Sequence, residues 1–178
     1  MLQSPPWELD ALPEAAFVTT TVPLFEGAPR FLARLAAARP FGSPAALFEA
    51  AERIALAMPE DEQRELIDAH PRLGAPPGSV SALSYVEQGY DREVAYAAAE
   101  AVRSDVDAQL ERLNREYEAR FGFRYCVRVA GRPRSALLRE FEDALSRPVA
   151  DERRRALRAV VDIARDRWLK TRQTREGA

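Results

Sequence analysis

The chain has 178 residues, of which 47% are hydrophobic and 30% are charged. This length and composition suit a folded chain with one buried core and exclude a disordered or collagen-like protein. The 26 basic and 28 acidic side chains nearly cancel, which argues against nucleic acid or a membrane surface as a partner. The single cysteine, Cys126, cannot form an internal disulfide, and no Cys/His cluster has the spacing of a zinc site, so we expect no bound metal.

No apolar run approaches the roughly 20 residues that span a bilayer, and the proline-rich, acidic first ten residues do not resemble a secretion signal. We therefore expect a cytoplasmic protein that does not enter a membrane. We predict one domain over residues 1–178, with peripheral tails at residues 1–10 and 171–178. The expected fold is all-α: a compact bundle of about seven to nine helices with one extended segment near residues 122–129.

Proline and capping signals divide the first part of the chain into helices. A first helical pattern ends before Pro40, because the residue before a proline avoids helical geometry. Ser43 is a good N-cap and Pro44 suits the first position of the next helix. The acidic stretch after Pro59 opens a further helix, which should run to about Ala69. The apolar stripe of the helix after Ser43 consists of Leu47, Ala51, Ile54 and Met58.

The middle of the chain combines a proline-rich loop with the longest helical pattern. Residues 75–79, Ala-Pro-Pro-Gly-Ser, cannot continue a helix and predict an exposed or ligand-facing loop. From Asp91 to about Arg120, apolar residues recur at helical spacing and predict one long helix. Its stripe consists of Val94, Ala98, Val102, Val106, Leu110, Leu113 and Tyr117.

Residues 121–129 break this period, because apolar residues then occupy alternate positions as in a strand. No partner strand is predicted, so the backbone N–H and C=O groups need other partners, which a ligand could supply. The same alternation turns Arg124 and Arg128 toward solvent. Two helices follow, at about residues 135–145 and 150–170.

The only histidine, His70, is the natural general acid or base if the protein is an enzyme, because its ordinary pKa lies near neutrality. A histidine at the end of a helix can also interact only with the helix dipole or a core acceptor. Pro71 and the irregular backbone after it favour a binding site, since such sites are commonly built on loops.

Two further residues each allow a functional and a structural interpretation. Glu87 follows Ser84 by three positions, so the pair can be a capping box with Ser84 as N-cap, or Glu87 can face His70. In the second case Gln88 adds an amide to the site. Arg167 lies on the apolar stripe of the last helix and needs an anion, which is either an acidic side chain or a ligand carboxylate.

These segments also carry a family resemblance over about residues 17–170. The segments are Ala69-His70-Pro71-Arg72-Leu73-Gly74, then Ser84, Glu87 and Gln88, then Tyr117 with Arg120-Phe121-Gly122-Phe123, and finally Ile163, Ala164 and Arg167. In this order they resemble the 2-oxo-4-hydroxy-4-carboxy-5-ureidoimidazoline (OHCU) decarboxylase family, which acts in urate breakdown.

The resemblance implies an all-helical, cofactor-independent enzyme, often a homodimer, that decarboxylates a small anionic substrate, OHCU, to (S)-allantoin. It makes His70 the catalytic histidine and Glu87 its acidic partner. The substrate-binding residues that it implies are Pro71, Ser84, Tyr85, Val86, Gln88, Tyr125, Cys126, Val127, Arg128, Val129 and Arg167.

Two alternatives stay open from the sequence. The arginines at positions 124 and 128 lie in a segment that is more apolar in the family, so the chain could act on a different carboxylated heterocycle. The chain could also be a non-catalytic helical interaction module. A shared cavity that holds His70, Glu87 and Arg167 would favour an enzyme, and wide separation of the three would favour the module.

Overall fold

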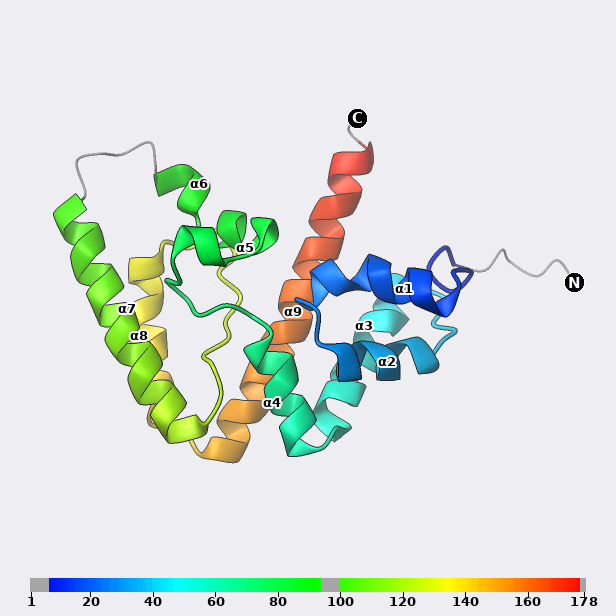
Figure 1. Ribbon diagram of the computed structural model, residues 1–178, viewed down its shortest axis with the longest axis horizontal. Helices are drawn as coiled ribbons and strands as arrows, with labels where there is room; N and C mark the ends of the chain where they lie inside the picture. The colour runs from blue at the N-terminus through cyan, green and yellow to red at the C-terminus, as the bar shows by residue number, and fades with distance from the viewer. Residues whose placement is uncertain (1–6, 94–99, 177–178) are drawn as a thin grey trace, which may run out of the picture.

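The computed structural model describes residues 7–93 and 100–176, which form helices joined by turns and loops (Figure 1). The first half of the chain contributes α1 (Glu14–Thr21), the 3-10 turn η1 (Val22–Leu24), α2 (Pro29–Ala37), α3 (Pro44–Ala57) and α4 (Glu60–Asp68). The rest of the chain contributes η2 (Pro77–Ser79), α5 (Ala82–Glu87), α6 (Tyr90–Glu93), α7 (Glu100–Phe121), α8 (Arg134–Ala144) and α9 (Val149–Glu176). No strand occurs in these two ranges, so the predicted all-α fold is confirmed.

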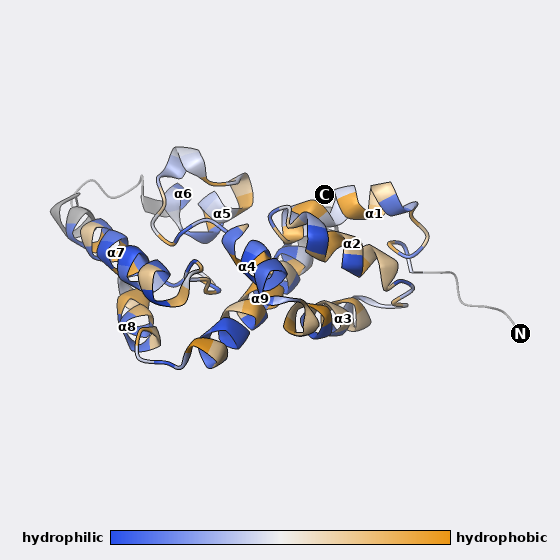
Figure 2. Cartoon of the chain, turned by 60° about the horizontal axis from the view of Figure 1, so that its bottom comes forward, coloured by the Kyte–Doolittle hydropathy of each residue, from blue (hydrophilic) through white to orange (hydrophobic). Residues whose placement is uncertain are grey.

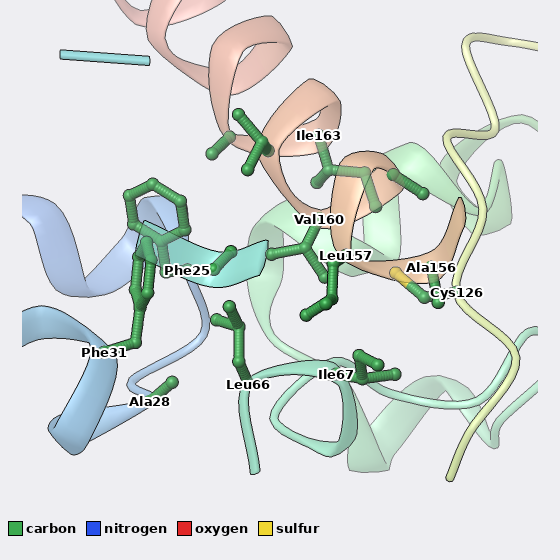
Figure 3. Close-up of a cluster of buried hydrophobic side chains, with 14 of the residues drawn as sticks. Phe25, Ala28, Phe31, Leu66, Ile67, Cys126, Ala156, Leu157, Val160 and Ile163 are labelled. Carbon is green, nitrogen blue, oxygen red and sulfur yellow. The ribbon is translucent and has the colours of Figure 1, made fainter. Parts of the chain in front are cut away.

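The long helix α9 runs between two groups of helices (Figure 1). On one side it packs against α3, α4 and η1, and on the other side α7 and α8 pack against each other. Hydrophobic and hydrophilic residues interleave along α7, α8 and α9, as expected for helices with one buried face (Figure 2). In the core, Leu157 and Val160 of α9 face Leu66 and Ile67 of α4 (Figure 3). This packing fixes the start of the His70 loop beside α9.

The predicted signals for the starts of α3 and α4 are confirmed. The Ser43 hydroxyl accepts the N–H of Ala46 at 3.2 Å, and Pro44 occupies the first turn of α3. Three acidic residues stand in the first turn of α4, where they complement the positive end of the helix dipole. Because α4 ends at Asp68, His70 lies just beyond the helix on the loop that follows.

The capping-box interpretation of Ser84 and Glu87 is wrong. The N-cap of α5 is Ser81, whose hydroxyl accepts the N–H of Ser84 at 3.1 Å. The helix therefore begins three residues earlier than the capping box required. Ser84 lies inside the helix and is buried, and its hydroxyl bonds Glu26 and Arg167 instead of capping α5.

Within the described residues, α6 and α7 account for the predicted helix from Asp91 to Arg120. Two residues of its stripe, Val94 and Ala98, lie outside the described residues. The side chain of Val102 is not described either, and the rest of the stripe along α7 is confirmed, since Leu110, Leu113 and Tyr117 are buried and Val106 packs against the core.

Residues near the described N-terminal end contact the helices. Leu9 is buried, the Trp7 ring meets Trp168 edge-on at 5.8 Å between centroids, and the Asp10 carboxylate accepts the N–H groups of Phe41 and Gly42. At the other end α9 continues to Glu176. Of the predicted tails, residues 1–6 and 177–178 lie outside the described ranges.

The extended segment at residues 122–129 is confirmed and runs between α9 and the α7/α8 pair (Figure 1). Charged side chains satisfy part of its backbone: Asp68 accepts the N–H of Arg124 at 2.7 Å, and Arg155 donates to the carbonyl of Cys126 at 2.9 Å. The prediction that Arg124 faces solvent is wrong. Its guanidinium donates to the carbonyls of Asp68 and His70, because the end of α4 lies against this segment and offers unpaired carbonyls.

Candidate active site

One pocket of about 510 Å³, counting the space that opens to solvent, gathers most of the predicted site residues. It lies where the loop after α4, helix α5, the extended segment and α9 meet. The predicted residues that line it are His70, Pro71, Ser84, Glu87, Gln88, Tyr125, Cys126, Val127, Arg128, Val129 and Arg167. His70, Glu87 and Arg167 thus share one cavity, the arrangement that favours an enzyme over an interaction module.

Two predicted residues, Tyr85 and Val86, do not line this pocket. Ser84, Glu87 and Gln88 share one face of α5 because residues three and four apart on a helix are neighbours, whereas the two residues between them point elsewhere. The Val86 side chain is 52% exposed, and the Tyr85 ring packs against Tyr90 at 5.4 Å between centroids. The prediction that these two side chains contact substrate is therefore not supported by their placement.

The imidazole of His70 is buried, and the residue lines the pocket. Nδ1 lies 3.4 Å from the carbonyl oxygen of Leu66, and Nε2 is buried without a hydrogen-bond partner in the described part of the chain. A carbonyl can only accept, so this contact requires the proton on Nδ1. Nε2 then carries a lone pair and can accept a proton.

Burial, and to a smaller extent the positive charge of Arg167, lower the pKa of His70 to about 4. The carboxylate of Glu26 acts in the opposite direction. At neutral pH the imidazole is therefore uncharged, which is the state in which Nε2 acts as a base.

Arg167 is buried and every nitrogen of its guanidinium donates a hydrogen bond. It holds Glu87 with two bonds of 2.8 and 2.7 Å, and it donates to a Glu26 oxygen at 2.8 Å. The remaining donors reach the Ser84 hydroxyl at 3.1 Å and the carbonyl of Pro23 at 2.7 Å. Of the two anions that the sequence left open for Arg167, the structure has the acidic side chains. The guanidinium positions Glu87 at the pocket wall.

Gln88 ties the loop after His70 to α5. Its side-chain oxygen accepts the N–H of Gly74 at 2.8 Å, and its amide nitrogen donates to the carbonyl of Arg72 at 3.2 Å. Gly74 has φ +80°, and a Cβ there would meet Leu110 Cδ1 at 2.8 Å. The glycine therefore allows the loop to turn directly against α7.

Sequence reasoning missed Glu26 and several lining residues. Glu26 lies in the turn between η1 and α2 and accepts hydrogen bonds from Arg167, Ser84 and Ser81. No helical stripe or motif marks it, and the only local signal is the following Gly27. The lining residues without a predicted role in the site are Leu73, Ala130, Ile163 and Asp166.

Arg128 stands at the pocket with a guanidinium that is 49% exposed. Nη1 lies 3.5 Å from Asp166 Oδ1, a long contact, and Lys170 binds the same carboxylate at 2.9 Å. The Arg128 side chain is thus exposed to solvent, as predicted, but it also borders the pocket. Unlike Arg167, it keeps donors that a ligand can use.

A model of the OHCU decarboxylase family matches residues 10–169. The chain belongs to the OHCU decarboxylase family. The predicted family is therefore confirmed, and the match includes every residue that lines the pocket.

Two curated relatives span the same region. The chain is 27% identical over 157 residues to the 2-oxo-4-hydroxy-4-carboxy-5-ureidoimidazoline decarboxylase of Haloferax volcanii, covering 88% of this chain and 89% of that protein. It is 24% identical over 157 residues to a uric acid degradation bifunctional protein of a Bacillus species, covering 88% of this chain. The chain spans only 30% of the length of that bifunctional protein.

Two solved structures share the fold. An OHCU decarboxylase crystallised in the presence of (S)-allantoin superposes with a TM-score of 0.62 at 18% identity, covering 82% of this chain and 92% of that one. An (S)-allantoin synthase superposes with the same TM-score at 19% identity, covering 92% of this chain and 52% of that one. In the ranges described for this chain, no helix has the length and apolarity to cross a membrane, and no three His, Cys, Asp or Glu side chains are grouped as a metal site.

Proposed function

We propose that the chain decarboxylates OHCU to (S)-allantoin in urate degradation, with His70 as the residue that moves the proton and Glu87 as its acidic partner. Membership of the family makes the chain a carboxy-lyase of this pathway. The observation that carries the residue assignment is the neutral, buried imidazole of His70, whose Nε2 has no partner among the described residues.

The substrate carboxylate needs a cation. Because every guanidinium nitrogen of Arg167 already donates a hydrogen bond within the protein, Arg128 is the better candidate. The Arg128 guanidinium borders the pocket and makes one long contact, whereas the Arg167 side chain is only 1% exposed. Backbone donors of the extended segment add to this site. In the described part of the chain the N–H groups of Tyr125, Cys126 and Val127 make no hydrogen bond, as the sequence led us to expect.

The reaction suits this arrangement. Loss of carbon dioxide leaves its electron pair on the ring carbon, and the conjugated ring accepts that pair, so the step needs no cofactor as an electron sink. The proton of the neighbouring hydroxyl passes to His70 Nε2 and is returned to the ureido-bearing carbon from one side, while a ring nitrogen takes a proton from water. Arg167 holds Glu87 at the pocket wall, where its carboxylate repels the substrate carboxylate until carbon dioxide leaves.

The test supplies freshly generated OHCU and follows the circular dichroism of the allantoin that forms. We expect the protein to accelerate the decay of OHCU and to give one enantiomer, (S)-allantoin. His70→Gln should abolish the acceleration and the selectivity. A wild-type rate equal to the spontaneous decay would refute the proposed function, and full turnover in His70→Gln would refute the assignment of His70.

The role of Arg128 has its own test. Arg128→Gln should raise the KM for OHCU by roughly tenfold, the equivalent of about 1.4 kcal/mol, and change kcat less. The matched control is Arg158→Gln, which removes the same charge from an arginine that is 58% exposed, pairs with Glu52 and does not line the pocket. Equal effects of the two variants would show that Arg128 acts only through net charge.

The family resemblance and the composition also predict a homodimer and a cytoplasmic location. Sedimentation velocity of the purified chain checks the first prediction. Fractionation of the source cells checks the second.

A further inference from the structure

We infer that Glu26 is a positioning residue of the active site, which holds Arg167 and helix α5 in place around His70 and supplies one of the charges that face its imidazole. The inference rests on the proposed function, because it adds a residue to the same site. Glu26 does not line the pocket, so it acts through the residues that do.

The carboxylate of Glu26 joins three elements that are far apart in the sequence. Its Oε1 accepts hydrogen bonds from the hydroxyls of Ser81 and Ser84 at 2.8 and 2.7 Å, which fixes the first turn of α5. The same oxygen accepts from Arg167 on α9 at 2.8 Å. Removing the carboxylate would therefore loosen α5, which carries Glu87, and would leave a buried guanidinium with one acidic partner instead of two.

The backbone at this position is unusual for a glutamate. Glu26 has φ +53°, in the left-handed region that non-glycine residues with a side chain of this size rarely adopt. Gly27 continues the turn at φ +85°. A strained conformation persists only where surrounding contacts determine it, and here those contacts are the bonds to α5 and α9.

Burial also bears on the charge of Glu26. Burial favours a higher pKa for this carboxyl, but the hydrogen bond from Ser84 and the charge of Arg167 outweigh it and hold the pKa below the ordinary value of 4.5. Glu26 is therefore an anion at every pH at which the enzyme would work. Its negative charge raises the pKa of His70 against the opposing effects of burial and Arg167.

The electrostatics at His70 come from several elements. The ionisable groups that line the same pocket are Glu87 from α5, Tyr125, Cys126 and Arg128 from the extended segment, and Asp166 and Arg167 from α9. Burial raises the pKa of the Cys126 thiol to about 12, so this group is neutral. Asp68 and Arg124 do not line the pocket, and Arg124 reaches the loop through the carbonyls of Asp68 and His70. Arg167 binds both Glu87 and Glu26, and at His70 the charge of Glu26 acts against that of Arg167.

The experiment uses the single histidine. Because His70 is the only histidine in the chain, labelling with 15N-histidine gives one imidazole spin system in NMR, and its titration needs no substrate. Glu26→Gln should move the midpoint of that titration to lower pH by roughly half a unit or more, since a nearby negative charge is lost. The matched control is Glu65→Gln, which removes a carboxylate that pairs with Arg30 away from the pocket and should leave the midpoint unchanged.

A second variant covers the case in which Glu26→Gln does not fold. Glu26→Asp keeps the charge but is one methylene shorter, so we expect a smaller shift in the same direction. If the folded variants keep the wild-type midpoint, the inference is wrong.

Kinetics separate this inference from the proposed function. Glu26→Gln should lower kcat for OHCU more than it raises KM, because it moves Glu87 and His70 rather than a group that binds substrate. A wild-type protein without decarboxylase activity would refute the proposed function while leaving the NMR result to decide on Glu26.

Discussion

Replacing His70 by glutamine should remove a pH-dependent loss of stability that the buried imidazole imposes on the wild-type protein. Burial holds the pKa of His70 at about 4, against an ordinary value of 6.5. Because the folded state has the lower pKa, the unfolded state binds the extra proton between these two values. Stability is therefore unaffected above about pH 6.5 and falls as the pH falls toward 4.

The magnitude follows from linkage. A difference of this size between folded and unfolded pKa values costs about 3 kcal/mol in total once the pH is below both, and about 2 kcal/mol of that is lost between pH 7 and pH 4.5. The carboxylates and other groups titrate in both proteins, so the difference between wild type and His70→Gln isolates the imidazole.

The assay is urea unfolding of both proteins at pH 7 and pH 4.5. Wild type should lose about 2 kcal/mol more of its free energy of unfolding than His70→Gln over this interval. Equal losses in the two proteins would mean that the imidazole titrates normally. His70 would then be partly protonated near neutrality, and its role as a neutral base at Nε2 would have to be abandoned.

Three further substitutions test the surroundings of the site by urea unfolding. Gly74→Ala should destabilise the protein by about 2 kcal/mol, because it combines a positive φ with a contact of 2.8 Å to Leu110, and a neutral result would contradict that packing. Arg167→Met should cost about 3–5 kcal/mol and abolish turnover, since it leaves Glu26 and Glu87 without their shared cation; a loss below about 1 kcal/mol would count against a buried ion pair. Tyr125→Phe removes a buried hydroxyl that has no partner in the described ranges, so stability should stay the same or rise by up to about 1 kcal/mol, and a clear loss would reveal a partner for that hydroxyl.

Local patterns were sufficient for most of the helical fold. Pro40 and Ser43 marked the end of α2 and the start of α3, because proline and an N-cap hydroxyl act on the backbone within a few residues. The extended segment was visible as a change of period. The order of His70, Glu87 and Arg167 in the chain was enough to recognise the family, and all three line one pocket.

Other features were decided by packing. Ser81 and Ser84 are both suitable N-caps, and only the position of α5 against Glu26 and Arg167 made Ser81 the cap and Ser84 part of the site. Strand-like alternation would have turned Arg124 outward, yet the free carbonyls at the end of α4 bind its guanidinium.

The charged residues of the site depend on both helical spacing and tertiary packing. Helical spacing determined that Arg167 points into the protein, because a side chain on an apolar stripe shares its direction with the neighbours on that stripe. Its partners, Glu87 and Glu26, are 80 and 141 residues away in the sequence. The periodic backbone fixes which residues share a helix face, but only the tertiary packing of α5, α9 and the turn before α2 brings these opposite charges together, since a buried guanidinium is stable only where anions surround it.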